Sequence, residues 1–144
     1  GAEGAAIYEE VARAGASVCI MHNGRSGIRG DIIAAKREWR SRAVELAALA
    51  GIPRERILLD GGIGFNGGAE ADRELEARYA ELGSLGLPLL IGASRKSFLG
   101  GAPEDRLPAT LAVTERAARA GVLFVRVHDI AENLAAIRRA EEKK

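Results

Sequence analysis

The residues with the clearest chemical potential form a Ser-Arg-Lys-Ser cluster at 94–97, directly after an apolar segment. Residues 88–92 are apolar without alternation, which is typical of a strand buried on both faces of a parallel sheet. The segment ends at a glycine, and Arg95 and Lys96 then place two positive charges where the next apolar pattern begins. Cations between a strand and the start of a helix favour the binding of an anion.

A second candidate is Asp60, which ends the apolar segment 57–59 and precedes a glycine-rich loop at 61–68. A carboxylate in this position can accept two parallel hydrogen bonds from a planar, amidine-like group. The alternative is a loop aspartate that caps its own backbone. The loop also has the GxGxxG spacing of dinucleotide-binding proteins, but the next strand ends without the acid that such proteins use for the ribose.

A third polar group ends the last apolar segment. Arg126 and His128 are two positions apart, so on a strand they would lie on the same side of the sheet, with Asp129 pointing away. An arginine beside an imidazole suits a phosphate or pyrophosphate, whose oxygens accept several hydrogen bonds. The alternative is an arginine paired with a surface acid. His22 is more typical of a structural histidine, and no two histidines have the spacing of metal ligands.

These groups must be positioned by a regular alternation of strands and helices. A first helix is expected at residues 2–14, and strands are expected at 17–21, 57–59, 88–92 and 122–127. Helical patterns follow each strand, at 31–50 and on the stripes Leu75/Tyr79/Leu82, Leu107/Leu111/Thr114/Ala118 and Leu134/Ile137; a glycine-rich loop is expected at 23–30 and a solvated tail at 141–144. Strict alternation predicts an α/β fold with a parallel sheet. The polar groups all follow strands, at the sheet edge where such folds bind ligands.

One helix has a defined start and a defined buried stripe. Asp31 is a suitable N-cap for a helix that runs through residue 50. Its apolar positions recur every three or four residues, which predicts that they face the core: Ile32, Ala35, Trp39, Ala43 and Leu46.

Composition excludes several classes of protein. The 144 residues, 47% hydrophobic and 4% aromatic, suit about one domain, and 21 basic and 20 acidic residues are interspersed, which argues against a nucleic-acid partner. The single cysteine, Cys19, lies in an apolar segment and is expected to be a buried structural thiol, so a disulfide framework is excluded. No segment is apolar enough to predict a membrane span or a signal peptide, so a reducing cytoplasm is expected.

Four segments together resemble dihydropteroate synthase: VCIMH at 18–22, LDGGIGF at 59–65, LIGASRKSF at 90–98 and VRVHD at 125–129. Their order and spacing match the family, and Arg106-Leu107 and Thr110 follow the third segment as the family's pattern requires. The resemblance covers strands five to eight of the family's (β/α)₈ TIM barrel. It therefore implies four βα units, the C-terminal half of that barrel, in one partial domain at 1–144 that lacks the N-terminal half.

The resemblance also implies an activity. The family condenses a dihydropterin pyrophosphate with p-aminobenzoate and releases pyrophosphate, a step in folate biosynthesis. Carried over by position, Asp60 would hold the amino-pyrimidine edge of the pterin and Lys96 its polar ring atoms. Arg126 would lie against the pterin and, with His128, would hold the departing pyrophosphate.

The remaining roles implied by the resemblance belong to the walls of the site. Met21 and Gly92 would line the pterin slot, Phe65 would border the aminobenzoate, and Ser97 would receive its carboxylate at a helix N-terminus. Magnesium would act through the substrate pyrophosphate, without protein metal ligands in this chain, since Mg²⁺ prefers phosphate oxygens and water. The family's Asp-Pro-Gly turn is Asp-Gly-Gly here, and Asn66-Gly67 replaces its usual Gly-Lys pair.

Four βα units leave two exposed sheet edges and half a core, which something must cover. The expected partner is a second copy, giving a homodimer, or the missing N-terminal half, and residues 1–144 alone are expected to be incomplete for catalysis. One alternative function is the pterin- or methyltetrahydrofolate-binding domain of a corrinoid-linked methyltransferase. Another is a half-barrel assembly module with a vestigial site.

Overall fold

The computed structural model of the chain describes residues 2–24 and 28–142, so the loop expected at 23–30 and the tail expected at 141–144 lie partly outside the described residues. The main elements follow in the order α1 (Ala2–Arg13), β1 (Val18–Met21), α2 (Ile32–Leu49), β2 (Ile57–Asp60), α3 (Ala69–Ala77), β3 (Leu89–Ile91), α4 (Leu107–Arg119), β4 (Phe124–Val125) and α5 (Ile130–Glu141). Short 3₁₀ helices lie between them: η1 (Arg54–Arg56), η2 (Tyr79–Leu85), η3 (Ser97–Leu99) and η4 (Pro103–Asp105).

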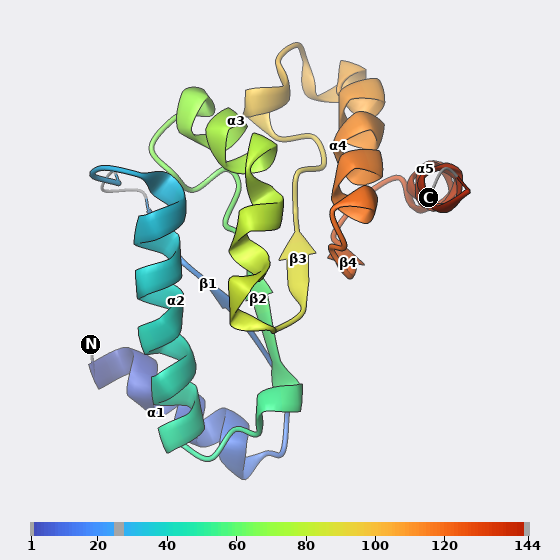
Figure 1. The fold of residues 1–144 in the computed structure, drawn as a ribbon. Coiled ribbons are helices and arrows are strands. Elements are labelled where there is room, and N and C mark those ends of the chain that lie inside the picture. Colours follow the sequence, from blue (N-terminus) through green and yellow to red (C-terminus); the bar gives the residue numbers. More distant parts are fainter. Residues whose placement is uncertain (1, 25–27, 143–144) are drawn as a thin grey trace.

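The four strands form one parallel sheet in the order β1-β2-β3-β4. Each strand is followed by helical structure before the next begins, and α5 lies beside α4 at the end of the row (Figure 1). The α/β fold class is confirmed. In the sheet register Met21 pairs with Asp60, and Asp60 pairs with Leu90, so the strand ends that carry the candidate residues are adjacent.

The two faces of the sheet differ in burial. On the face toward the helices the side chains are buried, as at Ile57, Leu59 and Ile91. On the other face Leu58 is only half-buried, and its register partner Cys19 is exposed. The prediction of a buried structural thiol was therefore wrong, because Cys19 projects from the face that no helix covers.

The last strand is shorter than expected. The apolar segment 122–127 contributes only Phe124 and Val125 to the sheet. As an edge strand, β4 pairs with β3 alone, and its side chains have little to pack against: Leu123 is 71% exposed and Phe124 49% exposed. The apolar segment predicted a longer strand, but the second face and the outer edge of β4 are open and offer it nothing to pack against.

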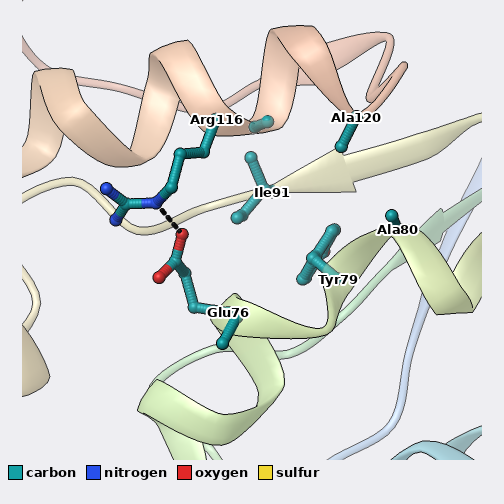
Figure 2. Close-up of a pocket in the computed structure, with 8 residues that line it drawn as sticks. Glu76, Tyr79, Ala80, Ile91, Arg116 and Ala120 are labelled. Carbon is teal, nitrogen blue, oxygen red and sulfur yellow. Dashed lines mark hydrogen bonds and ion pairs between the residues drawn. The ribbon is translucent and has the colours of Figure 1, made fainter.

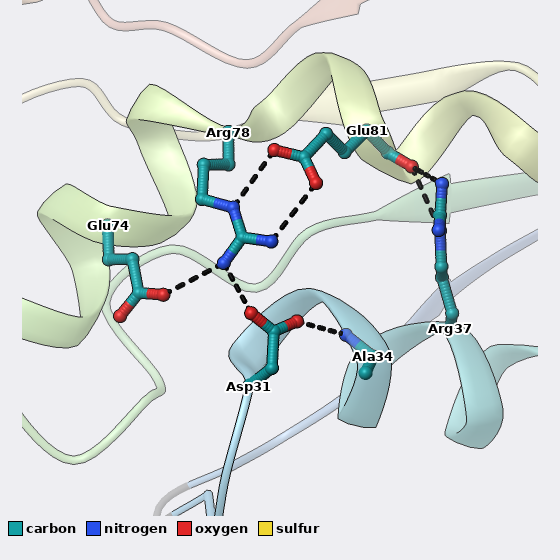
Figure 3. A network of polar contacts seen from close by, with 6 residues as sticks. All are labelled: Asp31, Ala34, Arg37, Glu74, Arg78 and Glu81. Atoms are coloured by element: carbon teal, nitrogen blue, oxygen red, sulfur yellow. Dashed lines mark hydrogen bonds and ion pairs between the residues drawn. The ribbon is translucent and has the colours of Figure 1, made fainter.

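The helix predicted from the stripe Leu75/Tyr79/Leu82 is two elements, α3 and η2. The break falls at Arg78, whose φ of −108° and ψ of 17° leave the helical range. Its guanidinium forms ion pairs with Asp31, Glu74 and Glu81, as Figure 3 shows. All three side chains of the stripe are nevertheless buried, because a 3₁₀ turn keeps an i, i+3 pair on one face.

The helix predicted after Asp31 is confirmed, and its buried face matches the expected stripe only in part: Ile32 and Ala43 are buried as predicted. Asp31 Oδ1 accepts a hydrogen bond from the backbone N–H of Ala34 at 2.8 Å, which is the predicted cap (Figure 3). Leu46 is 45% exposed, and Ala35 and Trp39 are only half-buried. The fully buried face includes two cations: Ile32, Ile33, Lys36, Arg40, Ala43 and Ala47.

A small pocket lies in the outer layer, between η2, β3 and α4. Tyr79, Ile91 and Ala120 are among the residues that line it, and the Glu76–Arg116 ion pair of 2.9 Å lies at one side (Figure 2). None of the candidate site residues named from the sequence lines this pocket, and it has few polar groups. Among the described helices, none combines the length and apolarity that crossing a membrane requires.

Candidate functional site

Asp60 lies at the C-terminal end of β2, between the ends of β1 and β3. Its side chain is on the same face as Leu58, the face that the helices leave open, although the following loop leaves Asp60 only 6% exposed. Its Oδ1 accepts a hydrogen bond from the backbone N–H of Gly62 at 2.7 Å. The aspartate thus caps its own loop through one oxygen, which leaves the second carboxylate oxygen available for a ligand.

Tyr79 fixes the residue after Asp60. The backbone N–H of Gly61 donates to the Tyr79 hydroxyl at 2.7 Å, and that hydroxyl donates to the carbonyl of Leu90. A Cβ on Gly61 would lie 2.3 Å from the phenol, and a proline there would have no N–H to donate. The departure from the Asp-Pro-Gly turn therefore accompanies a hydrogen-bonded link between β2 and β3. Burial raises the pKa of the Tyr79 hydroxyl, which keeps it protonated.

The glycine loop, residues 61–68, is braced from α3. Asp72, which is 4% exposed, accepts hydrogen bonds at Oδ1 from the backbone N–H of Gly64 at 2.8 Å and from the Asn66 amide at 2.7 Å. The same Asn66 amide donates to the carbonyl of Gly62 at 3.0 Å. The second departure from the family pattern, Asn66, therefore ties the loop to α3.

Lys96 reaches from the segment after β3 across to the glycine loop. Its Nζ donates to the carbonyl of Ile63 at 2.6 Å and lies 4.4 Å from the centre of the Phe65 ring. The lysine chain runs where a Cβ on Gly64 would be, at 2.6 Å, so the absence of a side chain there permits the approach. Burial and, to a lesser degree, Arg126 lower the pKa of Lys96. The ammonium is thus held at the inner edge of the site.

Arg126 follows β4 and lies against Gly92, which follows β3. The backbone N–H of Arg126 donates to the backbone carbonyl of Ile91 at 2.9 Å, and a Cβ on Gly92 would lie 2.6 Å from the guanidinium of Arg126. Only glycine allows this approach without moving the arginine. The side chain of Arg126 remains exposed, so its fork of donors is accessible to a ligand.

The segments after β3 and β4 are joined by two further contacts. Ser94 Oγ and His128 Nδ1 are 2.9 Å apart, which leaves Nε2 of the imidazole for another partner. Asp129 forms an ion pair of 2.7 Å with Arg95. The sequence placed Asp129 on the opposite side from Arg126 and His128; the chain has left the strand at Val125, so strict alternation no longer applies.

The last two sequence candidates line the same edge with fewer contacts. Met21 ends β1, is half-buried, and its Cγ lies 3.3 Å from the position of a Cβ on Gly62. Ser97 is exposed and is the first residue of η3, a 3₁₀ helix of three residues. The expected helix N-terminus at Ser97 is therefore a single short turn.

Arg106 holds the connection that carries Lys96 and Ser97. Its guanidinium donates to the carbonyls of Gly100 and Gly101 and, at 2.7 Å, to the carbonyl of Arg95. Arg95 has a positive φ of 58°, which a non-glycine residue rarely adopts. The resemblance includes Arg106 but implies no role for it. The sequence feature that could have indicated a structural role is the position of Arg106 between the Gly100-Gly101 pair and the start of α4.

Sequence reasoning also missed Lys36 and Arg40, both of which have 0% exposure on α2. Lys36 Nζ lies 3.5 Å from the carbonyl of His22, and the His22 ring stacks on Trp39 with centroids 4.8 Å apart. Burial lowers the pKa of His22, with smaller contributions from the two cations. The two cations are four residues apart, on the same face of α2 as Ile32, Ala43 and Ala47. This spacing is the sequence feature that could have placed them in the core.

The geometry thus gathers one carboxylate, two cations and an imidazole at the C-terminal edge of the sheet. Asp60 and Arg126 both influence the ionisation of Lys96, although no ion pair joins the three. Such an edge can bind a planar polar ring and an anion at the same time. Within residues 2–24 and 28–142, no group of three or more His, Cys, Asp or Glu side chains could hold a metal ion.

Comparison with known proteins decides the family. Residues 1–128 match a family model described as "Pterin binding enzyme". The chain belongs to the pterin-binding enzyme family. Dihydropteroate synthase of Escherichia coli K12, a transferase of folate biosynthesis, is 35% identical over 144 residues, which is 92% of this chain and 51% of that enzyme.

Other members of the family give the same picture. A probable bifunctional folylpolyglutamate synthase/dihydropteroate synthase of Haloferax volcanii is 38% identical over 136 residues, 88% of this chain and 16% of that protein. The crystal structure of dihydropteroate synthase from Clostridium difficile in the presence of pteroic acid superposes with a TM-score of 0.91 at 38% identity, covering 95% of this chain and 54% of that one. The four βα units thus match the TIM-barrel fold of these synthases. The chain spans about half the length of the E. coli and C. difficile enzymes.

Proposed function

We propose that this chain forms the pterin- and pyrophosphate-binding half of a dihydropteroate synthase. The observation that carries the proposal is that Asp60, Lys96 and Arg126 lie at one edge of the sheet. Because Gly92 has no side chain, the Arg126 guanidinium can lie against its backbone. The presence of pteroic acid in the C. difficile crystal structure supports a ligand of this kind for the family.

In the proposed complex the pterin lies between the ends of β2 and β3. The Asp60 carboxylate oxygen that is not bonded to Gly62 accepts hydrogen bonds from the amino-pyrimidine edge, and the Lys96 ammonium donates to the ring's polar atoms. Met21 and Gly92 line the slot. Lys96 already lies against Ile63 and the Phe65 ring, so less side-chain freedom is lost when a ligand binds.

Arg126 and His128 are proposed to stabilise the leaving group. The amine nitrogen of p-aminobenzoate forms a bond to the exocyclic methylene carbon of the dihydropterin, the carbon–oxygen bond to pyrophosphate breaks, and the amine releases a proton to solvent. The pyrophosphate leaves with the bonding electron pair, and that bond breaks early, so negative charge develops beside the guanidinium and the imidazole. Donors fixed before the reaction stabilise such charge without reorganisation.

The second substrate is proposed to enter from the exposed side. The Phe65 ring borders the aminobenzoate, and Ser97, exposed at the first residue of η3, donates its hydroxyl to the carboxylate. Neither residue forms a covalent bond with substrate. The chemistry therefore depends on orientation and on charge stabilisation.

Magnesium is proposed only as a companion of the pyrophosphate. The residues described here offer no cage of carboxylates and imidazoles, so phosphate oxygens and water would be its main ligands. When bound, the ion would neutralise part of the pyrophosphate charge. The steps assigned to Asp60, Lys96, Arg126 and His128 do not require it as a ligand of this chain.

We also propose that residues 1–144 are one partial domain that acts in the cytoplasm together with a second set of βα units. That set is the N-terminal half of the barrel or a second copy of the chain. The open face of the sheet and the half-length match to the relatives support this assembly. Residues 1–144 alone are then expected to bind pterin weakly and to show no turnover.

The test uses a protein that carries residues 1–144 together with the other half of the barrel. Lys96→Ala and Arg126→Ala should each reduce kcat/KM by about two orders of magnitude, on the order of 3 kcal/mol, with unchanged unfolding curves. Asp60→Asn should chiefly raise the dissociation constant of the dihydropterin pyrophosphate. Arg119→Ala, on the outer surface of α4, is the control.

The same measurements separate the alternatives. If pyrophosphate neither competes with nor promotes pterin binding, the leaving-group role of Arg126 is wrong and a methyltetrahydrofolate-binding domain becomes the better description. If a stable dimer forms that binds no pterin, the chain is an assembly module. Wild-type turnover in Lys96→Ala would remove that residue from the site.

A further inference from the structure

Lys36 is a buried cation that the proposed chemistry does not use. It lies on α2 with 0% of its surface exposed, and its Nζ is 3.5 Å from the backbone carbonyl of His22, at the end of β1. The same Nζ lies 3.5 Å from the position that a Cβ on Gly62 would have, so the ammonium is close to the glycine loop. Burying an ammonium that makes only one long hydrogen bond lowers the stability of the fold. Its presence here therefore calls for a functional or positional reason.

The surroundings of Lys36 contain charges of both signs from four elements. Asp60 belongs to β2 and Asp72 to α3, and both carboxylates favour the charged form of Lys36. Arg40, one turn along α2, disfavours it, and burial disfavours it most. His22, from β1, contributes its carbonyl and an imidazole whose pKa is lowered. The two cations and two carboxylates balance in net charge.

Asp72 connects this cluster to the site. It accepts hydrogen bonds from Gly64 and Asn66, and the loop so braced presents the Ile63 carbonyl and the Phe65 ring to Lys96. The carboxylate of Asp72 also favours the charged form of Lys36, while Lys96 donates to the Ile63 carbonyl of the same loop. The loop is therefore close to Lys36 at Gly62 and bonded to Lys96 at Ile63, an arrangement called the clamp below.

We propose that Lys36 is a positioning residue for the candidate site: its ammonium joins the end of β1 to the Asp72-braced glycine loop and so holds the Ile63 carbonyl and Phe65 in place for Lys96. The functional part of this inference rests on the proposed pterin site. The structural part concerns the loop alone and can be tested without a ligand.

The clamp should depend on pH. Burial lowers the pKa of Lys36 from its ordinary 10.5 to about 8, so the ammonium loses its proton at mildly alkaline pH. Of the other groups that face it, His22 has a lowered pKa and titrates at more acid pH, and Arg40 stays charged. A change near pH 8 that disappears with Lys36 is therefore assigned to it.

The first experiment measures amide hydrogen exchange on the 144-residue chain. Lys36→Met keeps the volume and removes the charge, and Arg40→Met makes the same change one turn away on α2 while leaving the contact between Lys36 Nζ and the His22 carbonyl in place. At pH 7 the protection factor of the Gly64 N–H, which is bonded to Asp72, should fall about tenfold in Lys36→Met and remain unchanged in Arg40→Met. The core N–H of Leu59 serves as the reference for global stability.

The second experiment uses the protein that carries residues 1–144 together with the other half of the barrel, and it measures the affinity of that protein for dihydropterin pyrophosphate between pH 6.5 and 9.5. Wild-type affinity should weaken as pH rises through about 8, and Lys36→Met should be weaker at pH 7 and flat across pH 8. If Gly64 and Leu59 lose protection equally, or if the inflection persists in Lys36→Met, the positioning role is wrong. If the wild type binds no pterin while Gly64 responds as predicted, the proposed function fails and the loop clamp stands.

Discussion

At the residue scale, side chains that never touch a ligand define the position of Asp60. Asp60 caps its own loop, and Tyr79 joins the next residue, Gly61, to Leu90 on β3. The carboxylate is therefore oriented by one bond within the loop and by a second bond between strands. A proline would restrict the backbone at 61 through its ring, whereas here a phenol restricts it through a hydrogen bond.

Tyr79→Phe tests this link. The change leaves the buried N–H of Gly61 without an acceptor, so the free energy of unfolding should fall by about 1–3 kcal/mol in urea denaturation. Tyr8→Phe is the matched control, since Tyr8 is the only other tyrosine and its hydroxyl forms no hydrogen bond with residues 2–24 and 28–142. Equal stability losses in the two variants would show that the bridge between β2 and β3 contributes nothing.

Lys36 should also leave a signature in global stability. Its pKa is about 8 in the folded chain and near 10.5 when unfolded, so the unfolded chain binds more protons between these values. Stability contributed by this group is therefore lowest below pH 8 and rises as pH increases to 10.5. Wild type should gain about 3 kcal/mol relative to Lys36→Met across that window, measured by urea unfolding at several pH values. A constant difference would mean that Lys36 titrates normally.

Sequence patterns predicted some residues better than others for a physical reason. Asp31, Asp60 and Lys96 stand at the ends of elements, where local chain direction decides their surroundings. Lys36 and Cys19 lie within elements, where the side of the chain that faces the core is set by tertiary packing. The apolar segment around Cys19 predicted a buried thiol, but the thiol is exposed, and Lys36, which the sequence did not single out, is buried.

At the element scale, the connection between β3 and α4 is a rigid unit rather than a loose loop. Arg106 donates to carbonyls on both sides of η3, and Thr110 accepts the backbone N–H of Arg95 at 3.3 Å. Since Lys96 and Ser97 lie inside this unit, their positions depend on α4. The sequence predicted the strand, the turn and the helix here, but it did not predict this internal bonding, which involves backbone carbonyls.

Arg106→Ala should loosen that unit. Loss of bonds to several carbonyls should lower the free energy of unfolding by about 2 kcal/mol and speed exchange of the Leu99 and Gly100 amides. Arg116→Ala is a suitable control, because Arg116 lies on the same helix and pairs with Glu76 instead. Unchanged exchange at Leu99 in Arg106→Ala would assign the rigidity of the connection to other contacts.

At the scale of the whole molecule, the sheet has one covered face and one open face. The open face carries Cys19 and the partly exposed Leu58, Leu90 and Phe124, and the outer edges of the two edge strands, β1 and β4, have no partner strand in the described structure. Sequence alternation predicted the α/β fold, and the structure confirms it. The openness could not be read from periodicity, because apolar strands in half a barrel and in a closed barrel have the same pattern.

The thiol of Cys19 can report whether this face becomes the interior of a barrel. It is the only cysteine and is exposed, although burial of part of the side chain and the nearby Asp60 raise its pKa. In residues 1–144 alone it should react completely with a disulfide reagent at pH 8 under native conditions. With the other half of the barrel present, the rate should fall more than about tenfold, since closure places the thiol among packed side chains. An unchanged rate in the closed assembly, with the same reagent and pH, would mean that this face is not the barrel interior and that the proposed pterin slot is not enclosed there.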